Sequence, residues 1–306
     1  MGKILVTGGD GMVGHALRKL NPPDLVFISR KDADLTRFDE TIKIFETIRP
    51  EAVVHLAAKV AGLGGNMAHL GELYRNNILI NTNVLESARL VKVKKLLSFL
   101  STCAYPVNID HALKENSLHD GPPHPGNFAY SFAKRMLDVQ SRAYRKEWGC
   151  NFITAIPSNM YGPHDNWSLE DGHVISSLIH KCFLARKNST DLTVWGSGTP
   201  LREFVISDDA AKLALWALKN YEEEIPINFS PGEEVRIKDL VELIANKTEF
   251  KGKIIWDASK PDGQHRKPTD NTKLKEYLPD FKFTSIEQGI EKTVGWFVAN
   301  YPNVKM

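Results

Sequence analysis

The 306-residue sequence has few cysteines, no long apolar run and almost no net charge. Its three cysteines, Cys103, Cys150 and Cys182, are odd in number and lack metal-ligand spacing, which indicates reduced thiols and no metal site. No apolar stretch approaches the roughly 20 residues of a membrane span. With 39 basic and 37 acidic residues, the net charge of +2 gives no reason to expect nucleic-acid or membrane partners. Because the first residues also lack a signal-peptide layout, we expect a cytoplasmic protein.

The first half of the chain alternates short apolar segments with longer amphipathic ones. Strands are predicted at 3–7, 24–29, 52–56, 96–100 and 152–156, and helices at 12–20, 38–48, 72–90 and 130–148. Such alternation predicts an α/β fold, a doubly wound and mostly parallel Rossmann-like sheet whose ligands bind beyond the carboxyl ends of the strands.

The second half is less regular. A Pro-, His- and Gly-rich loop is predicted at 107–127, helices at 173–186, 208–219 and 286–300, and a strand at 192–195. We expect residues 1–165 to form a nucleotide-binding domain onto which 200–225 packs back. Residues 166–199 and 226–306 are expected to form a smaller mixed α/β substrate domain.

A glycine-rich turn follows the first predicted strand and opens the first helix. Gly8, Gly11 and Gly14 allow a tight turn and close approach of a pyrophosphate, with Met12 and Val13 at the helix N-terminus. The strand–turn–helix context favours dinucleotide binding over a glycine turn without a ligand.

The end of the second strand favours NADP(H) over NAD(H). Arg30 and Lys31 stand where a carboxylate would contact a free ribose 2′-hydroxyl, and a guanidinium suits a 2′-phosphate. A solvated basic loop is the alternative. Asp34 and Leu35 are placed to meet the adenine, although an exposed turn aspartate explains Asp34 equally well.

Tyr130 and Lys134 lie one helical turn apart, which suggests a phenol whose pKa the ammonium lowers. Ser101, after the fourth strand, can hydrogen-bond a substrate carbonyl or the tyrosine oxygen. The thiol of Cys103 can remove an acidic C–H proton beside a ketone, and His173 can protonate a carbanion. Taken alone, each residue has a simpler explanation that we favour: Cys103 as a small buried hydrophobe, and His173 as a helix-start or surface histidine.

Two polar turns in the second half suit a nucleoside diphosphate. Trp195 could stack on a base, and the cations Arg202 and Lys267 could bind phosphates, with Asp262 in the second turn. Turns of this composition also occur without ligands.

Together these motifs resemble the extended short-chain dehydrogenase/reductases and, more specifically, the GDP-L-fucose synthase group of that family. The resemblance covers essentially the whole chain and extends to the segments 55–60, 101–106, 161–166, 172–175, 202–204 and 260–263.

The resemblance implies a GDP-sugar enzyme with two chemistries in one pocket. Cys103 and His173 would invert C5 and C3 of GDP-4-keto-6-deoxy-D-mannose. Tyr130 would then protonate O4 during hydride transfer from NADPH, with Lys134 tuning it and Ser101 orienting the carbonyl. The resemblance also places Ser158 and Asn159 beside the cofactor and Lys181, Trp195, Arg202 and Asp262 on the GDP-sugar. A homodimer is expected on the same ground.

Three positions depart from the commonest pattern of the family. Asp10 puts a carboxylate in the phosphate loop, Ala61 replaces a frequent glycine, and Lys181 replaces an arginine. Other nucleotide-sugar epimerases or reductases remain alternatives. Cys103 argues against a 4,6-dehydratase, which would have an acidic pair there, and Arg30 argues against an NAD-recycling 4-epimerase. A non-catalytic NADP(H)-binding protein is the alternative from another class.

Overall fold

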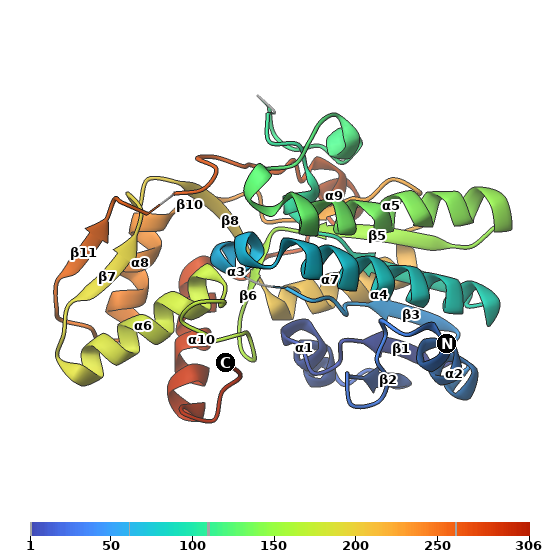
Figure 1. Cartoon of the computed structure of the whole chain (residues 1–306), viewed down its shortest axis with the longest axis horizontal. Helices are drawn as coiled ribbons and strands as arrows, with labels where there is room; N and C mark the ends of the chain where they lie inside the picture. Colours follow the sequence, from blue (N-terminus) through green and yellow to red (C-terminus); the bar gives the residue numbers. More distant parts are fainter. Residues whose placement is uncertain (1, 61, 109–110, 261) are drawn as a thin grey trace.

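The computed structural model describes residues 2–60, 62–108, 111–260 and 262–306. Its main body is a six-stranded parallel sheet in the order β2-β1-β3-β4-β5-β9, with helices on both faces (Figure 1). The strands are β1 Ile4–Thr7, β2 Leu25–Ile28, β3 Ala52–His55, β4 Lys95–Phe99, β5 Phe152–Pro157 and β9 Ile227–Phe229. β1, β3, β4 and β5 are buried along their whole length, as expected for strands covered by helices on both sides. The predicted doubly wound fold is therefore confirmed.

Two apolar cores cover the two faces of this sheet. On one face pack α1 Met12–Leu20 and α7 Ser207–Asn220, and on the other α2 Phe38–Ile48, α4 Leu70–Leu90 and α5 Phe128–Trp148. A short helix, α3 Leu63–Ala68, precedes α4 and was not predicted. Helices α1 and α2 have the predicted bounds, and α4 and α5 each begin two residues earlier than predicted.

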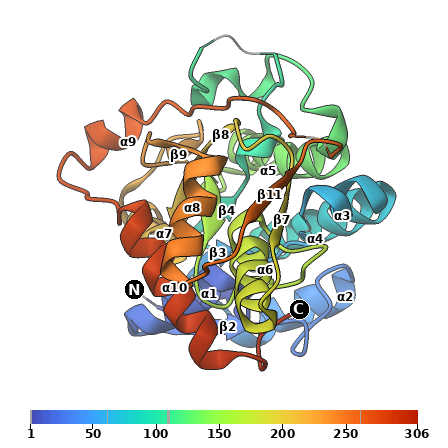
Figure 2. The same cartoon turned by 90° about the vertical axis from the view of Figure 1, so that its left-hand side faces the viewer.

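A second group of elements lies beside the carboxyl ends of the sheet strands and has its own core. It contains β6 Asn159–Tyr161, α6 Val174–Asn188, β7 Leu192–Trp195, β8 Leu201–Ile206, β10 Glu234–Arg236, α8 Ile237–Lys247, β11 Ile254–Asp257 and α10 Ile286–Asn300. These strands form a β10-β8-β6 sheet and a β11-β7 pair. Figure 2 shows α6, α8 and α10 gathered on this side of the molecule.

Some of the later elements differ from the sequence prediction. β9 pairs with β5 and so extends the main sheet, although residues 226–306 were predicted to belong to the second domain. The predicted loop at 107–127 contains the short 3₁₀ helices Glu115–His119 and Pro125–Asn127. The helix α9 Thr272–Tyr277 lies between β11 and α10 in the chain, and its Leu274 packs in a core of the main sheet. The division of the chain into two domains stays a prediction.

Candidate active site

The glycine turn between β1 and α1 is shaped for close approach of an anion. Gly8 has φ +71°, and a Cβ there would lie 2.9 Å from the Ala57 nitrogen. A Cβ on Gly14 would lie 2.4 Å from the Gly9 carbonyl oxygen, so α1 packs directly on the turn. Gly11 is the N-cap of α1 and no side chain caps the helix. The N–H groups of the first turn, beginning at Met12, can therefore bind a phosphate.

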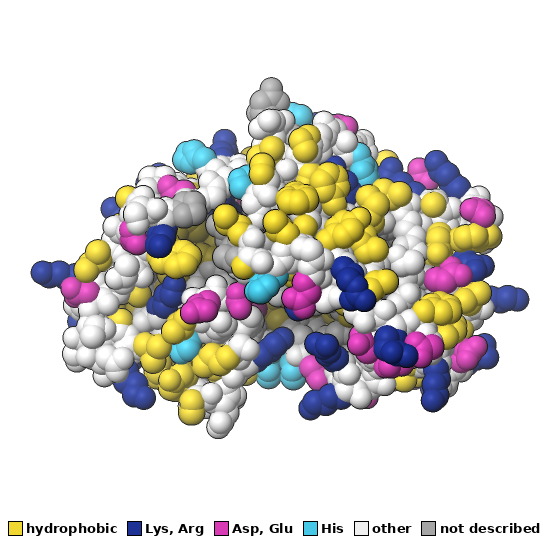
Figure 3. Space-filling view, in the orientation of Figure 1, with side chains coloured by type: hydrophobic (Ala, Val, Ile, Leu, Met, Phe, Trp, Pro, Cys, Tyr) yellow, Lys and Arg dark blue, Asp and Glu magenta, His cyan; other side chains and the backbone are white. Residues whose placement is uncertain are grey.

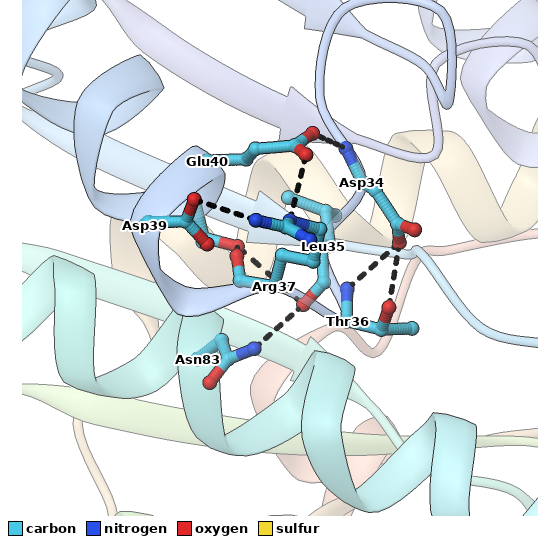
Figure 4. Close-up of polar contacts among 8 residues, drawn as sticks. Asp34, Leu35, Thr36, Arg37, Asp39, Glu40 and Asn83 are labelled. Carbon is cyan, nitrogen blue, oxygen red and sulfur yellow. Dashed lines mark hydrogen bonds and ion pairs between the residues drawn. The ribbon is translucent and has the colours of Figure 1, made fainter.

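The segment after β2 is held in place by hydrogen bonds from two helices (Figure 4). The Asp34 carboxylate accepts from the Thr36 N–H and hydroxyl at 3.0 and 2.8 Å, and its own N–H donates to Glu40 at 2.8 Å. Asn83 of α4 donates to the Leu35 carbonyl at 3.0 Å. Arg30 is exposed at the start of this segment. The contacts fix the backbone where the sequence placed the adenosine end of the cofactor.

Ser158 and Asn159 lie where β5 leads into β6. The Ser158 hydroxyl is buried and has no hydrogen-bond partner within the described structure, so it can receive a polar group of a ligand. The Asn159 amide donates to the Glu203 carbonyl at 2.7 Å, which leaves its oxygen free to accept. The crowded glycine turn, the uncapped helix and this buried hydroxyl together fit a dinucleotide.

The thiol and the phenol belong to one site. Ser101 caps the 3₁₀ turn Thr102–Ala104 after β4, and its Oγ accepts the Cys103 N–H at 3.2 Å. Cys103 is half-buried. Tyr130 of α5, Arg202 and Lys267 lie within electrostatic range of the thiol. Because Ser101 accepts with a lone pair, its own O–H remains able to donate to a carbonyl.

The expectation that Lys134 lowers the pKa of Tyr130 is wrong for the chain by itself. Burial, and to a smaller extent the charge of Cys103, raises the pKa of Tyr130 well above its usual value. The Lys134 ammonium donates to the Phe99 carbonyl at 2.8 Å and lies 6.0 Å from the centre of the tyrosine ring. Burial lowers the pKa of Lys134 to about 8. Desolvation of the phenolate thus outweighs the nearby positive charge, and Tyr130 stays a protonated phenol at neutral pH.

His173 pairs with a carboxylate that sequence reasoning did not single out. Its Nδ1 lies 2.9 Å from Asp165 Oδ1, and Asp165 is 4% exposed. Burial lowers the pKa of His173, but the charge of Asp165 and its hydrogen bond outweigh burial, so the net shift is upward. Only the position of Asp165 in the segment 161–166, eight residues before the histidine, hinted at this role. The pair favours a protonated, oriented imidazolium.

The Trp195 ring is exposed and lies near the side chains of two lysines. The side chain is 54% exposed at the end of β7, and its ring centre lies 5.1 Å from Lys181 Nζ and 5.5 Å from Lys260 Nζ. Lys260 was not among the predicted binding residues. An aromatic face flanked by two cations fits a nucleobase followed by phosphates.

Arg202 lies within electrostatic range of the thiol and of Asp262. Burial lowers its pKa, while the charges of Cys103 and Asp262 act in the opposite direction, so both groups are near its guanidinium. Its Nη1 donates to the Leu201 carbonyl at 2.7 Å. Asp262 itself accepts from the Ser197 N–H and hydroxyl, both at 2.7 Å, and so holds the turn after Trp195. Half-buried Lys267 is a second cation within electrostatic range of Cys103.

The structure thus brings Ser101, Cys103, Tyr130, Arg202 and Lys267 together, and it places Trp195 with Lys181 on the second group of elements. No hydrogen bond or ion pair in the described ranges joins His173 to Cys103. Asp10 turns to Arg18, 3.6 Å away. Ala61, one of the three departures from the family pattern, and Pro261, in the resembling segment 260–263, lie outside the described residues.

A dinucleotide turn, a Tyr–Lys pair and a parallel sheet define the class. The chain belongs to the NAD-dependent epimerase/dehydratase family, whose model matches residues 4–230. Within it the chain groups with GDP-L-fucose synthases. It is 48% identical to the GDP-L-fucose synthase of Dictyostelium discoideum over 99% of this chain and 97% of that protein. It is 42% identical to a probable GDP-L-fucose synthase of Drosophila melanogaster over the full length of both.

A solved structure agrees with these relatives. The GDP-L-fucose synthetase of Naegleria fowleri bound to NADP superposes with a TM-score of 0.94 at 39% identity, covering 100% of this chain and 96% of that one. Within the part of the chain that the structure describes, none of the helices combines the length and apolar character needed to cross a membrane.

Proposed function

We propose that the protein converts GDP-4-keto-6-deoxy-D-mannose to GDP-L-fucose by epimerisation at C3 and C5 and reduction at C4. The observation that carries the proposal is the half-buried Cys103 beside Tyr130, because a simple ketone reductase needs the phenol but not the thiol. The named activity of the relatives supports the same conclusion.

The epimerisation uses Cys103 and His173. Each C–H bond beside the C4 ketone is acidic, and the Cys103 thiolate removes the proton to leave an enolate. The imidazolium of His173, favoured by Asp165, returns a proton from the other face and inverts the carbon. Arg202 and Lys267 place positive charge next to this pocket, which stabilises the enolate.

The reduction uses Ser101, Tyr130 and Lys134. NADPH, when bound, supplies the hydride to C4. Ser101 donates to the ketone oxygen and Tyr130 gives that oxygen its proton, while Lys134, fixed by its hydrogen bond to the Phe99 carbonyl, holds the cofactor beside the phenol. The raised pKa of Tyr130 keeps the phenol protonated until a more basic alkoxide forms.

We infer the residues that would hold the two ligands from this geometry together with the sequence motifs. The cofactor is held by Gly8, Gly11, Met12, Val13, Gly14, Arg30, Asp34, Leu35, Lys134, Ser158 and Asn159. The GDP-sugar is held by Lys181, Trp195, Arg202 and Lys267, with Asp262 shaping the turn beside Trp195.

Turnover in heavy water tests the proposal. With GDP-4-keto-6-deoxy-D-mannose and NADPH, we expect solvent deuterium at C3 and C5 of the product, one NADPH oxidised per sugar, and GDP-L-fucose by NMR. Unlabelled product would contradict the proposed epimerisation at C3 and C5. Unchanged NADPH absorbance would contradict the proposed reduction at C4.

Asp165 offers a pH-dependent check on His173. In an Asp165→Asn variant the carboxylate charge that raises the pKa of His173 is lost. His173 then loses its proton at a lower pH than in the wild type. The decline of the exchange rate with rising pH should therefore begin at a lower pH, and exchange at neutral pH should be about 10- to 100-fold slower. An unshifted decline would contradict the acid role of His173. The variant's NADPH affinity, which should not change, reports on intact folding.

We also propose a cytoplasmic homodimer. Leu70 and Tyr74 of α4 and Phe128, Phe132 and Met136 of α5 line an apolar hollow of about 390 Å³. Figure 3 shows apolar side chains gathered over this face of α4 and α5, and Tyr74 and Phe128 are 45% and 44% exposed. A patch of this kind is typical of an interaction surface. Light scattering should give twice the chain mass, and a monomer mass at micromolar concentration would contradict the dimer.

A further inference from the structure

The unusual carboxylate of the phosphate turn has a partner on the same helix. The Arg18 side chain reaches back along α1 until its Nη2 lies 3.6 Å from Asp10 Oδ1. The same Nη2 lies 3.2 Å from where a Cβ on Gly9 would be. The guanidinium carbon stands 4.0 Å from the centre of the Phe27 ring. These three contacts place the charge of Arg18 between the glycine turn and the end of β2.

In this fold, NADP(H) and NAD(H) are distinguished at the corner formed by the glycine turn and the end of β2. The Gly9 N–H donates to the Ile28 carbonyl at 2.8 Å, so the turn and the last residue of β2 are joined. Residues just after the second strand face the adenosine ribose in this class of fold. Arg30 is one cation there, and Arg18 approaches the same corner from α1.

The carboxylates at this corner are already engaged. Asp32 Oδ2 accepts from the Ser29 N–H at 2.7 Å and from the Ser29 hydroxyl at 3.0 Å. These bonds, and to a smaller extent the charges of Arg18 and Lys31, hold the pKa of Asp32 below its usual range. Asp10 faces Arg18, which offsets the repulsion that a carboxylate in this turn would otherwise exert on a phosphate.

We propose that Arg18 is a second ligand for the cofactor 2′-phosphate. The Arg18 and Asp10 side chains are 42% and 58% exposed, and an ion pair in that setting contributes little. A guanidinium binds a phosphate through paired, charge-assisted hydrogen bonds, which are stronger. The phosphate therefore wins the competition for Arg18, while Phe27 keeps the guanidinium plane in place.

The inference rests on the NADPH-dependent reaction proposed above, and binding measurements separate the two. NADPH and NADH affinities are measured by fluorescence titration of the free protein, and 2′,5′-ADP and 5′-AMP affinities by calorimetry. The variant is Arg18→Gln, which keeps a planar polar group but removes the charge. Lys19→Gln is the matched control, because Lys19 is adjacent on α1 but points to Asp208 at 3.6 Å.

We expect Arg18→Gln to weaken NADPH and 2′,5′-ADP about 10- to 100-fold, the range of a lost charge-assisted pair. NADH and 5′-AMP should change less than about twofold, and Lys19→Gln should change neither. Arg18→Lys should recover part of the NADPH affinity through its point charge. An unchanged ratio of NADPH to NADH affinity in Arg18→Gln would overturn the inference, whereas failure of the wild type to bind NADPH would overturn the proposed function instead.

Discussion

A Cys103→Ser variant should lose solvent exchange at C3 and C5 of the GDP-sugar by about 10²- to 10⁴-fold. Serine occupies nearly the same volume, but its hydroxyl does not ionise near neutral pH, whereas an unperturbed thiol titrates near ~8.5. Cys103 lies near Tyr130, Arg202 and Lys267, and a serine hydroxyl that stays neutral gains nothing as a base from the positive charges of Arg202 and Lys267. Loss of the base therefore removes proton abstraction and leaves the rest of the pocket intact.

The measurement is deuterium incorporation in heavy water, read by mass spectrometry and by proton NMR of the recovered sugar. Cys150→Ser is the matched control, because Cys150 is also half-buried but lies between α5 and β5, outside the pocket. It should exchange at the wild-type rate. NADPH affinity should be unchanged in both variants. Wild-type exchange in Cys103→Ser would assign the base role to another group.

The first half of the fold follows from local signals in the sequence. Helices at Met12–Leu20 and Phe38–Ile48 begin and end as predicted, because apolar periodicity and flanking turns specify them locally. Among the later strands, β7 Leu192–Trp195 was predicted with its bounds, but β8 and β9 have no such signals. β9 is three residues long and becomes a strand only by pairing with β5, and β8 depends on partners from both β6 and β10. Pairings between distant segments leave no periodic trace in a short strand.

The site residues divide in the same way, into those with a local sequence signal and those that depend on the tertiary fold. The glycine turn could be predicted because its spacing is itself the structural requirement. The partners of the reactive groups could not: Asp165 reaches His173 only through the fold of the 162–173 segment. The pKa of Tyr130 was predicted in the wrong direction, because helical spacing reports that Lys134 is near but not how deeply the phenol is buried. Burial is a tertiary property, and here it decides the sign of the shift.

A Tyr130→Phe variant should uncouple the two chemistries. Without the phenol no group gives O4 its proton during reduction, so NADPH oxidation should fall about 10²- to 10⁴-fold. Cys103 and His173 remain, so deuterium should still enter C3 and C5 at a rate within a few-fold of wild type, and labelled 4-keto sugar should accumulate. Lys134 keeps its bond to the Phe99 carbonyl at 2.8 Å, and the ring that packs near its ammonium is retained, so the fold and NADPH affinity should be preserved. Equal loss of exchange and reduction would contradict separate roles for Cys103 and Tyr130, because it would make the phenol part of the epimerisation as well. Exchange without reduction here, against no exchange in Cys103→Ser, would place the proton-abstracting thiol before the proton-donating phenol in the reaction sequence.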